Sequence, residues 1–142
     1  MKNEMILMFD AISDNESLSR LAIAAFIAPL NPTLEELSDV KTAVSEAVTN
    51  AIIHGYNNAG KDNMVRMHCI MENQEIHIEI EDKGVGIEDI EKAMEPLFTT
   101  KPELERSGMG FAFMEAFMDE LQVTSKVGQG TKVFMKKKIG EQ

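Results

Sequence analysis

Several residue types are scarce in this chain of 142 residues. It has no tryptophan and one cysteine, Cys69. A single cysteine excludes an internal disulfide and a cysteine-based zinc site, and it predicts a reducing, cytoplasmic location. No apolar run reaches the ~18 residues that a membrane span needs. The N-terminal stretch turns acidic too early for a signal peptide, so no membrane partner is expected.

Basic residues are also few. Asp and Glu total 24 against 14 Lys and Arg, which gives a net charge of −10. This charge opposes binding to a phosphate backbone, so no direct contact with nucleic acid is expected, although one small anion could still bind at a local site. Hydrophobic residues make up 44% and charged residues 27%, as in globular proteins, and the length predicts a single domain over 1–142.

The first half of the chain predicts one strand and two helices. A short apolar run predicts a strand at 5–9. Capping-box patterns at Ser13–Glu16 and Thr33–Glu36 open a helix over about 16–28 and a longer helix that ends near Gly55. Apolar residues recur every three or four positions along the long helix, which predicts one packed face: Leu34, Leu37, Val40, Val44, Val48 and Ala51.

The second half predicts four strands and two helical segments. Two β-like runs at 64–72 and 75–81 are joined by Asn73-Gln74, and the second alternates Ile with charged residues. Helical segments follow near 87–94 and 109–119, and then come strands at 121–127 and 131–138. The order β-α-α-β-β-α-α-β-β predicts an α+β fold, with helices on one face of a mixed, mostly antiparallel sheet.

The polar side of the long helix is unusual. Glu46 is the only formal charge between Thr42 and Gly55, and Glu46, Asn50 and His54 follow at i, i+4 and i+8. This spacing predicts that the three stack along one side. Taken one by one, such residues are typical of a solvated face. A solvated face normally carries Lys and Glu, however, so this one favours a surface covered by a ligand or by another element.

Two glycine-rich segments are candidate ligand sites. Asp82-Lys83-Gly84-Val85-Gly86 follows the best strand, and its glycines would let a ligand approach the backbone beside the Asp82 carboxylate. Ser107-Gly108-Met109-Gly110 opens an apolar helix, whose free N–H groups favour an anion. Hydroxyls and cations precede this helix at Thr99, Thr100, Lys101 and Arg106. A tight turn and a loop with scattered charges are the simpler interpretations of the two segments.

The order of these signals is more specific than any one of them. The chain contains, in this order, Glu46 to Gly55, Asp82-x-Gly84-x-Gly86, Gly108-x-Gly110 and Gly130-Thr131. This order resembles that of the motifs in the Bergerat ATP-binding fold of the GHKL superfamily. The resemblance covers residues 5 to about 138. It implies a two-layer sandwich of helices on a sheet, with ATP or ADP held between the long helix, the glycine turn and residues 95–110.

Length and chemistry narrow the resemblance. The topoisomerase, Hsp90 and MutL members carry further domains, for which this chain has no room. Histidine kinases usually have Asn at the position of Glu46, whereas a serine hydroxyl benefits from a carboxylate base. The chain therefore resembles the bacterial anti-sigma factor serine kinases. Segments such as SEAVTNAIIHGY and EPLFTTKPELERSGMGF resemble segments of the anti-sigma factors that act in sporulation.

The resemblance implies a role for each candidate. Asp82 would accept a hydrogen bond from the adenine amino group with Thr131 nearby, Gly84 and Gly86 would approach adenine and ribose, and Asn50 would ligate Mg²⁺. Glu46 would act as the catalytic base. His54 would either line the end of the site that holds the phosphates or have a structural role. The phosphates would be held by the remaining candidates: Thr99, Thr100, Lys101, Arg106, Ser107, Gly108, Met109 and Gly110.

The resemblance also implies two protein partners, a sigma factor and an anti-anti-sigma protein that is phosphorylated on serine, and a homodimer. Arg20 is the only charge from Ser17 to Leu34, on a helix rich in Ala, Ile and Phe. It is either a solvent cation on a core helix or the anchor of a partner-binding patch. The N-terminal strand with Met5 and Met8 could supply a dimer edge. Two other functions stay open: a nucleotide-gated sequestering module with incidental ATPase activity, and a histidine-kinase catalytic fragment.

Overall fold

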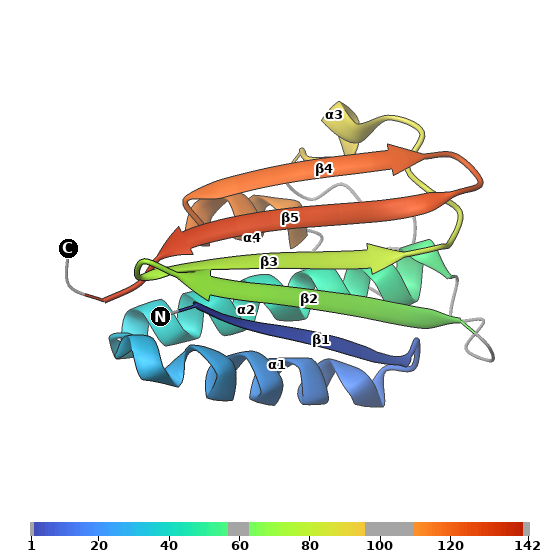
Figure 1. Cartoon of the computed structure of the whole chain (residues 1–142). Coiled ribbons are helices and arrows are strands. Elements are labelled where there is room, and N and C mark those ends of the chain that lie inside the picture. Colours follow the sequence, from blue (N-terminus) through green and yellow to red (C-terminus); the bar gives the residue numbers. More distant parts are fainter. Residues whose placement is uncertain (1, 57–62, 96–109, 141–142) are drawn as a thin grey trace.

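The predicted order of strands and helices is confirmed by a computed structural model, which describes residues 2–56, 63–95 and 110–140 (Figure 1). The strands are β1 (Lys2–Asp10), β2 (Met64–Glu72), β3 (Glu75–Asp82), β4 (Glu120–Lys126) and β5 (Gly130–Lys138). The helices are α1 (Asp14–Ile27), α2 (Leu34–Asn50), α3 (Ile90–Ala93) and α4 (Gly110–Phe117). A 3-10 turn, η1 (Ala28–Leu30), follows α1, and a π-helical turn, η2 (Ala51–Gly55), extends α2.

The five strands form one open sheet in the order β1-β2-β3-β5-β4. All four pairings between these described strands are antiparallel, so the mixed character expected for the sheet is not found. Asn73 and Gln74 join β2 to β3 with φ of 55° and 62°, the left-handed pair that a two-residue hairpin turn requires. Among the described strands, β1 has a neighbour on one side only, which makes it an edge strand of the sheet.

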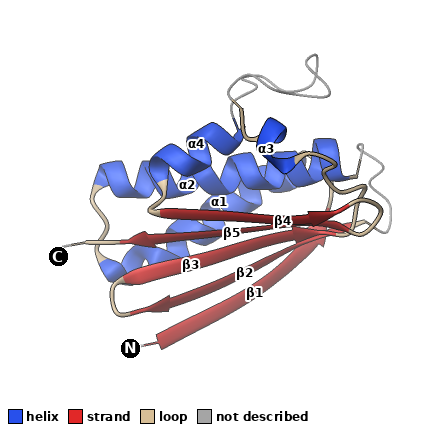
Figure 2. Cartoon of the chain, turned by 90° about the horizontal axis from the view of Figure 1, so that it is seen from above, coloured by secondary structure: helices blue, strands red, loops and turns tan. Residues whose placement is uncertain are grey.

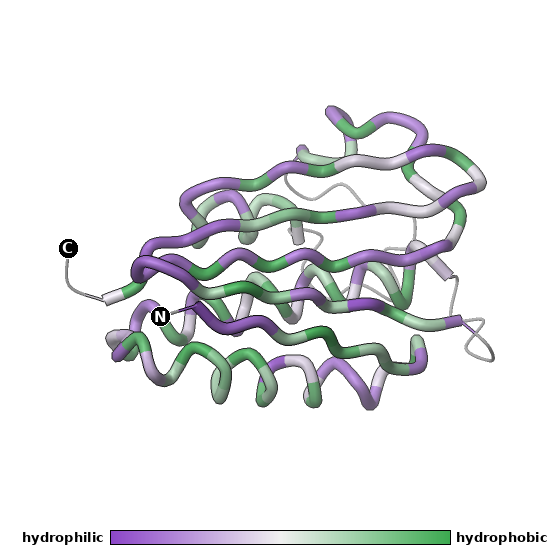
Figure 3. The backbone as a smooth tube through the Cα atoms, viewed as in Figure 1, coloured by the Kyte–Doolittle hydropathy of each residue, from purple (hydrophilic) through white to green (hydrophobic). Residues whose placement is uncertain are grey.

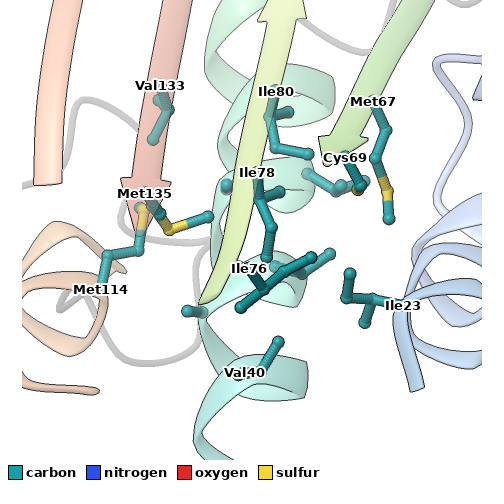
Figure 4. Packing of buried hydrophobic residues seen from close by; sticks show 14 of the residues in the cluster. Ile23, Val40, Met67, Cys69, Ile76, Ile78, Ile80, Met114, Val133 and Met135 are labelled. Carbon is teal, nitrogen blue, oxygen red and sulfur yellow. The ribbon is translucent and has the colours of Figure 1, made fainter. Parts of the chain in front are cut away.

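The molecule has two layers, with α1, α2 and α4 packed on one face of the sheet (Figure 2). Apolar and polar residues alternate along the strands (Figure 3), because successive side chains point to opposite faces. The inward residues of β3 meet the helices in the core: Ile76, Ile78 and Ile80 are at most 2% exposed (Figure 4). Among the described helices, none combines the length and the apolar character needed to cross a membrane.

The two predicted capping boxes have different outcomes. At the start of α2, the Glu36 N–H donates to Thr33 Oγ1 at 3.0 Å and the Thr33 N–H donates to Glu36 Oε1 at 2.8 Å, which confirms the box. At the start of α1 the prediction is wrong. Ser13 already has helical backbone angles and makes no side-chain cap, because an N-cap side chain needs an extended backbone to reach the N–H groups of the first turn.

The long helix departs from its prediction at both ends. Leu34 is 87% exposed in the first turn of α2, whereas the rest of the predicted apolar stripe is buried or half-buried. At the other end the α-helical pattern stops at Asn50, and the Tyr56 N–H donates to Ala51 O at 3.1 Å, a π-type bond. Glu46 and Asn50 therefore lie one α-helical turn apart within α2, whereas His54 lies in the π-helical turn that follows.

Candidate functional site

Three segments meet at one end of the molecule: the turn η2, the residues after β3, and the β4–β5 turn (Figure 1). Backbone hydrogen bonds join them. The Val85 N–H donates to Gly55 O at 2.8 Å, and the Gly128 N–H donates to Val85 O at 2.8 Å. The predicted glycine turn is therefore clamped between the end of the long helix and the last hairpin.

Asp82 is the buried carboxylate of this region, with 5% of its surface exposed. Its Oδ1 accepts a hydrogen bond from the Gly84 N–H at 2.9 Å. Burial raises the pKa of Asp82, and backbone hydrogen bonds from Gly84 and Thr131 partly oppose that rise because they favour the charged form. An acidic group in such a setting is a strong acceptor that water does not saturate, which suits it to bind a donor of a ligand.

The glycines of the turn are required by contacts within the protein. A Cβ on Gly84 would lie 1.8 Å from Gly55 O, and a Cβ on Gly86 would lie 2.3 Å from Lys126 O. Gly86 also has a φ of +79°, which side chains rarely adopt. Both glycines are needed here because backbone packs directly on backbone.

Thr131 lies beside Asp82, as the sequence predicted for the two. They are partners across the β3–β5 ladder, and Thr131 is 9% exposed. Its hydroxyl is 2.8 Å from Ser125 Oγ on β4. Ser125 was not among the predicted site residues, although its inward position in the alternation of β4 is a signal that could have indicated it.

Asn50 and Gly110, two predicted site residues from distant parts of the sequence, come together. A Cβ on Gly110 would lie 3.0 Å from Asn50 Nδ2, so the first described residue of α4 packs against the amide of Asn50. Glu46 lies four residues before Asn50 on the same α-helix. Glu46 and Asn50 are thus one helical turn apart on α2, and the Asn50 amide lies against the first described residue of α4. Seven further predicted site residues lie outside the described residues: Thr99, Thr100, Lys101, Arg106, Ser107, Gly108 and Met109.

A groove of about 720 Å³ runs along α1 and α2 and contains both Arg20 and Glu46 in its lining. Glu16 also lines it, pairs with the Arg20 guanidinium and accepts a hydrogen bond from Ser45 Oγ at 2.9 Å. Arg20 and Glu46 therefore share one groove, so Arg20 is not simply an isolated cation on the solvent side of a core helix.

Tyr56, which was not among the predicted site residues, connects the end of the long helix to the sheet. Its hydroxyl donates to Met64 O at 2.8 Å and accepts from the Lys83 N–H at 2.6 Å. Burial raises the pKa of Tyr56, so the phenol stays neutral and can donate. No periodic pattern marks this role, because it depends on where η2 meets the turn after β3.

The sequence of the chain matches the histidine kinase-like ATPase domain over residues 11–137. It is 58% identical to the anti-sigma F factor of Geobacillus kaustophilus over 141 residues, which are 99% of this chain and 96% of that protein. It is also 58% identical to the anti-sigma F factor of Clostridium acetobutylicum, over 98% of this chain and 96% of that protein. The chain belongs to the anti-sigma F factors.

Solved structures agree with this fold. RsbU and RsbW domains from Mycobacterium tuberculosis superpose with a TM-score of 0.68 at 17% identity, over 99% of this chain and 33% of that one. The catalytic domain of the histidine kinase ThkA gives a TM-score of 0.58 at 14% identity, over 95% and 96% of the two chains. The predicted family, α+β class and ATP-binding superfamily are confirmed: this is an anti-sigma factor with a kinase-like ATPase domain, in a family of serine kinases. The ATPase fold implies that ATP or ADP binds.

Proposed function

We propose that this chain transfers the γ-phosphoryl group of Mg·ATP to a serine of an anti-anti-sigma protein, and that it also holds a sigma factor. The single observation that carries the kinase part is the placement of Glu46 and Asn50 one turn apart on α2, with Gly110 packed on the Asn50 amide. The carboxylate of Glu46 would supply a base, and the amide of Asn50 would supply a metal ligand one turn further along the helix.

The base of the nucleotide would bind at Asp82. The buried carboxylate accepts hydrogen bonds, so the exocyclic amino group of adenine is the donor that it would select. Thr131 lies next to it across the ladder and would complete the contact. The charge-assisted bond forms in a site from which most water is excluded, and this strengthens it.

Mg²⁺ fits the Asn50 end of the site. Within the described ranges, no group of three or more His, Cys, Asp or Glu side chains could hold a metal. Mg²⁺ typically keeps several waters and uses few protein ligands together with phosphate oxygens, so the amide oxygen of Asn50 suffices. When bound, the ion neutralises charge on the phosphates. The phosphate-holding roles of Thr99, Thr100, Lys101, Arg106, Ser107, Gly108 and Met109 remain proposals, as does that of His54.

Glu46 would act on the acceptor. Its carboxylate takes the proton from the serine hydroxyl as the serine oxygen forms a bond to the γ-phosphorus, and the bond from that phosphorus to the β-γ bridging oxygen breaks to release ADP. A serine hydroxyl has a pKa far above neutral, so a positioned base assists its attack more than it would assist an imidazole.

The groove along α1 and α2 would receive the acceptor protein. It is lined by Arg20 at α1 and by Glu46 at the catalytic end, so a partner seated on Arg20 can bring its serine to Glu46. Arginine is enriched among residues that dominate binding energy at interfaces. The sigma factor would use Arg20 as well, which makes the two partners compete for one surface.

The edge strand β1 supports a homodimer. Ile6 and Met8 on its outward side are 54% and 53% exposed, and the strand has no neighbour on its outer side among the described residues. A long edge strand with exposed apolar residues is a template for pairing with another chain. Of the two methionines predicted for this edge, Met8 is outward and Met5 is half-buried against the core. The single cysteine of the chain fits a location in the reducing cytoplasm.

Labelling with γ-labelled ATP tests the reaction class. We expect acid-stable label on a small protein of a sporulating-cell lysate, because phosphoserine resists acid. Acid-labile label would indicate phosphohistidine and would favour the histidine-kinase alternative. ATP binding without labelled product would favour a nucleotide-gated sequestering module.

A further inference from the structure

We propose that Ser125 determines the base specificity of the nucleotide site by fixing the direction in which the Thr131 hydroxyl donates. Ser125 lies on β4 directly opposite Thr131 on β5, and the two hydroxyl oxygens are 2.8 Å apart. The inference rests on the proposed function, in which Asp82 and Thr131 receive the base. Ser125 acts through Thr131, so it is a positioning residue.

The Ser125 hydroxyl makes three hydrogen bonds, which use its one proton and both of its acceptor lone pairs. The Ile87 N–H donates to Ser125 Oγ at 2.7 Å, and Ser125 Oγ lies 3.0 Å from Gly130 O. A carbonyl oxygen only accepts and a serine hydroxyl carries one proton, so Ser125 donates to Gly130. The contact with Thr131 is then one in which Thr131 donates and Ser125 accepts.

This arrangement decides what Thr131 can offer to a ligand. Its single proton is directed at Ser125, so Thr131 presents only lone pairs elsewhere. Asp82, its partner across the β3–β5 ladder, is a carboxylate whose ionised form also only accepts. Two acceptors side by side select a donor, such as the 6-amino group of adenine. A 6-oxo purine would bring a third acceptor against them, and no hydrogen bond to its 6-oxygen could form.

Without Ser125, the Thr131 hydroxyl is released to rotate. It could then donate to the oxygen of a 6-oxo purine, while the bond to a 6-amino group would lose its fixed acceptor. Loss of Ser125 should therefore change the ratio of the two affinities. A role of Ser125 only in holding the hairpin to the glycine turn would lower both affinities alike and leave the ratio unchanged.

The test is calorimetric titration of the full chain with Mg·ADP and with Mg·inosine diphosphate, which differ at position 6 of the base. Wild type should prefer ADP, and Ser125→Ala should reduce that preference by about tenfold, the upper worth of one ordinary hydrogen bond. Thr124→Ala is the matched control, because Thr124 is the neighbouring hydroxyl on the exposed face of β4. It should keep the wild-type ratio.

A double-mutant comparison shows whether Ser125 acts through Thr131. Ser125→Ala should have no further effect on the ratio in a Thr131→Val background, and an additive effect would overturn the inference. Should Ser125→Ala not fold, Ser125→Cys is measured in its place, because it keeps the size but is a weak donor and acceptor. An unchanged ratio in the folded variant overturns the inference alone. Equal affinity of wild type for both nucleotides would contradict the proposed role of Asp82 as well.

Discussion

Gly84 lies so close to Gly55 that a Cβ on residue 84 would be 1.8 Å from the Gly55 carbonyl oxygen. That oxygen accepts a hydrogen bond from the Val85 N–H at 2.8 Å. The end of the long helix and the turn after β3 are thus joined through their backbones, and this joint holds the segment that begins with Asp82. The glycines of this turn are therefore required by backbone contacts within the protein.

Gly84→Ala should destabilise the protein by about 1–3 kcal/mol, the usual cost of forcing extra atoms into a packed region. The methyl group would push against backbone, which yields less than a side chain does. Chemical denaturation followed by circular dichroism measures the change in the free energy of unfolding. Lys83→Ala is the control, because its side chain is 75% exposed and should have little effect. Equal stability of the two variants would contradict the joint.

Asp82→Asn should weaken ADP binding by about 10- to 100-fold, the worth of one hydrogen bond to a charged group. The amide keeps the shape of the side chain but is a weaker acceptor and brings a donor to the adenine amino group. Calorimetry with ADP measures the loss. Unchanged affinity in the folded variant would exclude Asp82 from base recognition.

The same variant has an opposite effect on stability, which follows from the raised pKa of Asp82. Burial favours the protonated carboxyl, so the folded state binds more protons than the unfolded state in the pH window above 3.8, the ordinary pKa of an Asp side chain. The contribution of Asp82 to stability therefore falls as pH rises through this window. Without nucleotide at pH 7, Asp82→Asn should unfold at a higher temperature than wild type, and the difference should shrink as the pH is lowered. A wild type that is more stable than the variant at pH 7 would contradict this sign.

Tyr56→Phe should cost about 1–3 kcal/mol of stability, because the Lys83 N–H and Met64 O both lose the hydroxyl that pairs them. The aromatic ring and its burial are retained, so the loss reports on the hydroxyl alone. Thermal unfolding measures it. A variant as stable as wild type would show that water or neighbouring groups replace the hydroxyl.

The parts of this fold that could be predicted from sequence are those fixed by local chemistry. The alternation of Ile76, Ile78 and Ile80 and the capping box at Thr33 each depend on residues a few positions apart, and both predictions are confirmed. The capping box at Ser13 is wrong, because Glu16, its expected partner, instead pairs with Arg20 and accepts from Ser45, 29 residues away. Tertiary contacts of this kind cannot be derived from short-range spacing.

The site divides in the same way. The order of the motifs predicted that Asp82 and Thr131 lie together, and the β3–β5 ladder pairs them; their contact with a nucleotide stays a prediction. The π turn at Ala51–Gly55 could not be predicted, since the apolar repeat through Ala51 is equally compatible with an α-helix. Ser125 and Tyr56 went unnoticed because each is a single hydroxyl whose partners come from separate strands and turns.

Arg20→Ala should weaken binding of the acceptor protein or the sigma factor by at least about 2 kcal/mol, as for an interface residue that dominates affinity, with ADP affinity unchanged. Surface plasmon resonance with each purified partner measures this. Lys41→Ala is the matched control, because Lys41 is another cation in the lining of the same groove. Equal losses from the two variants would indicate general charge attraction in place of a specific anchor.

Phosphoryl transfer by a Glu46→Gln variant tests the central claim most directly, because the substitution removes the base but keeps the size of the side chain. We expect transfer to the serine acceptor to fall by about 10²–10⁴, the usual contribution of a general base, while ATP affinity stays near wild type. Asn50→Ala, one turn along α2, should instead lose both triphosphate affinity and transfer, because Asn50 acts on the donor through the metal. If Glu46→Gln lost ATP binding as severely as Asn50→Ala, or transferred phosphate at the wild-type rate, Glu46 would not be the catalytic base.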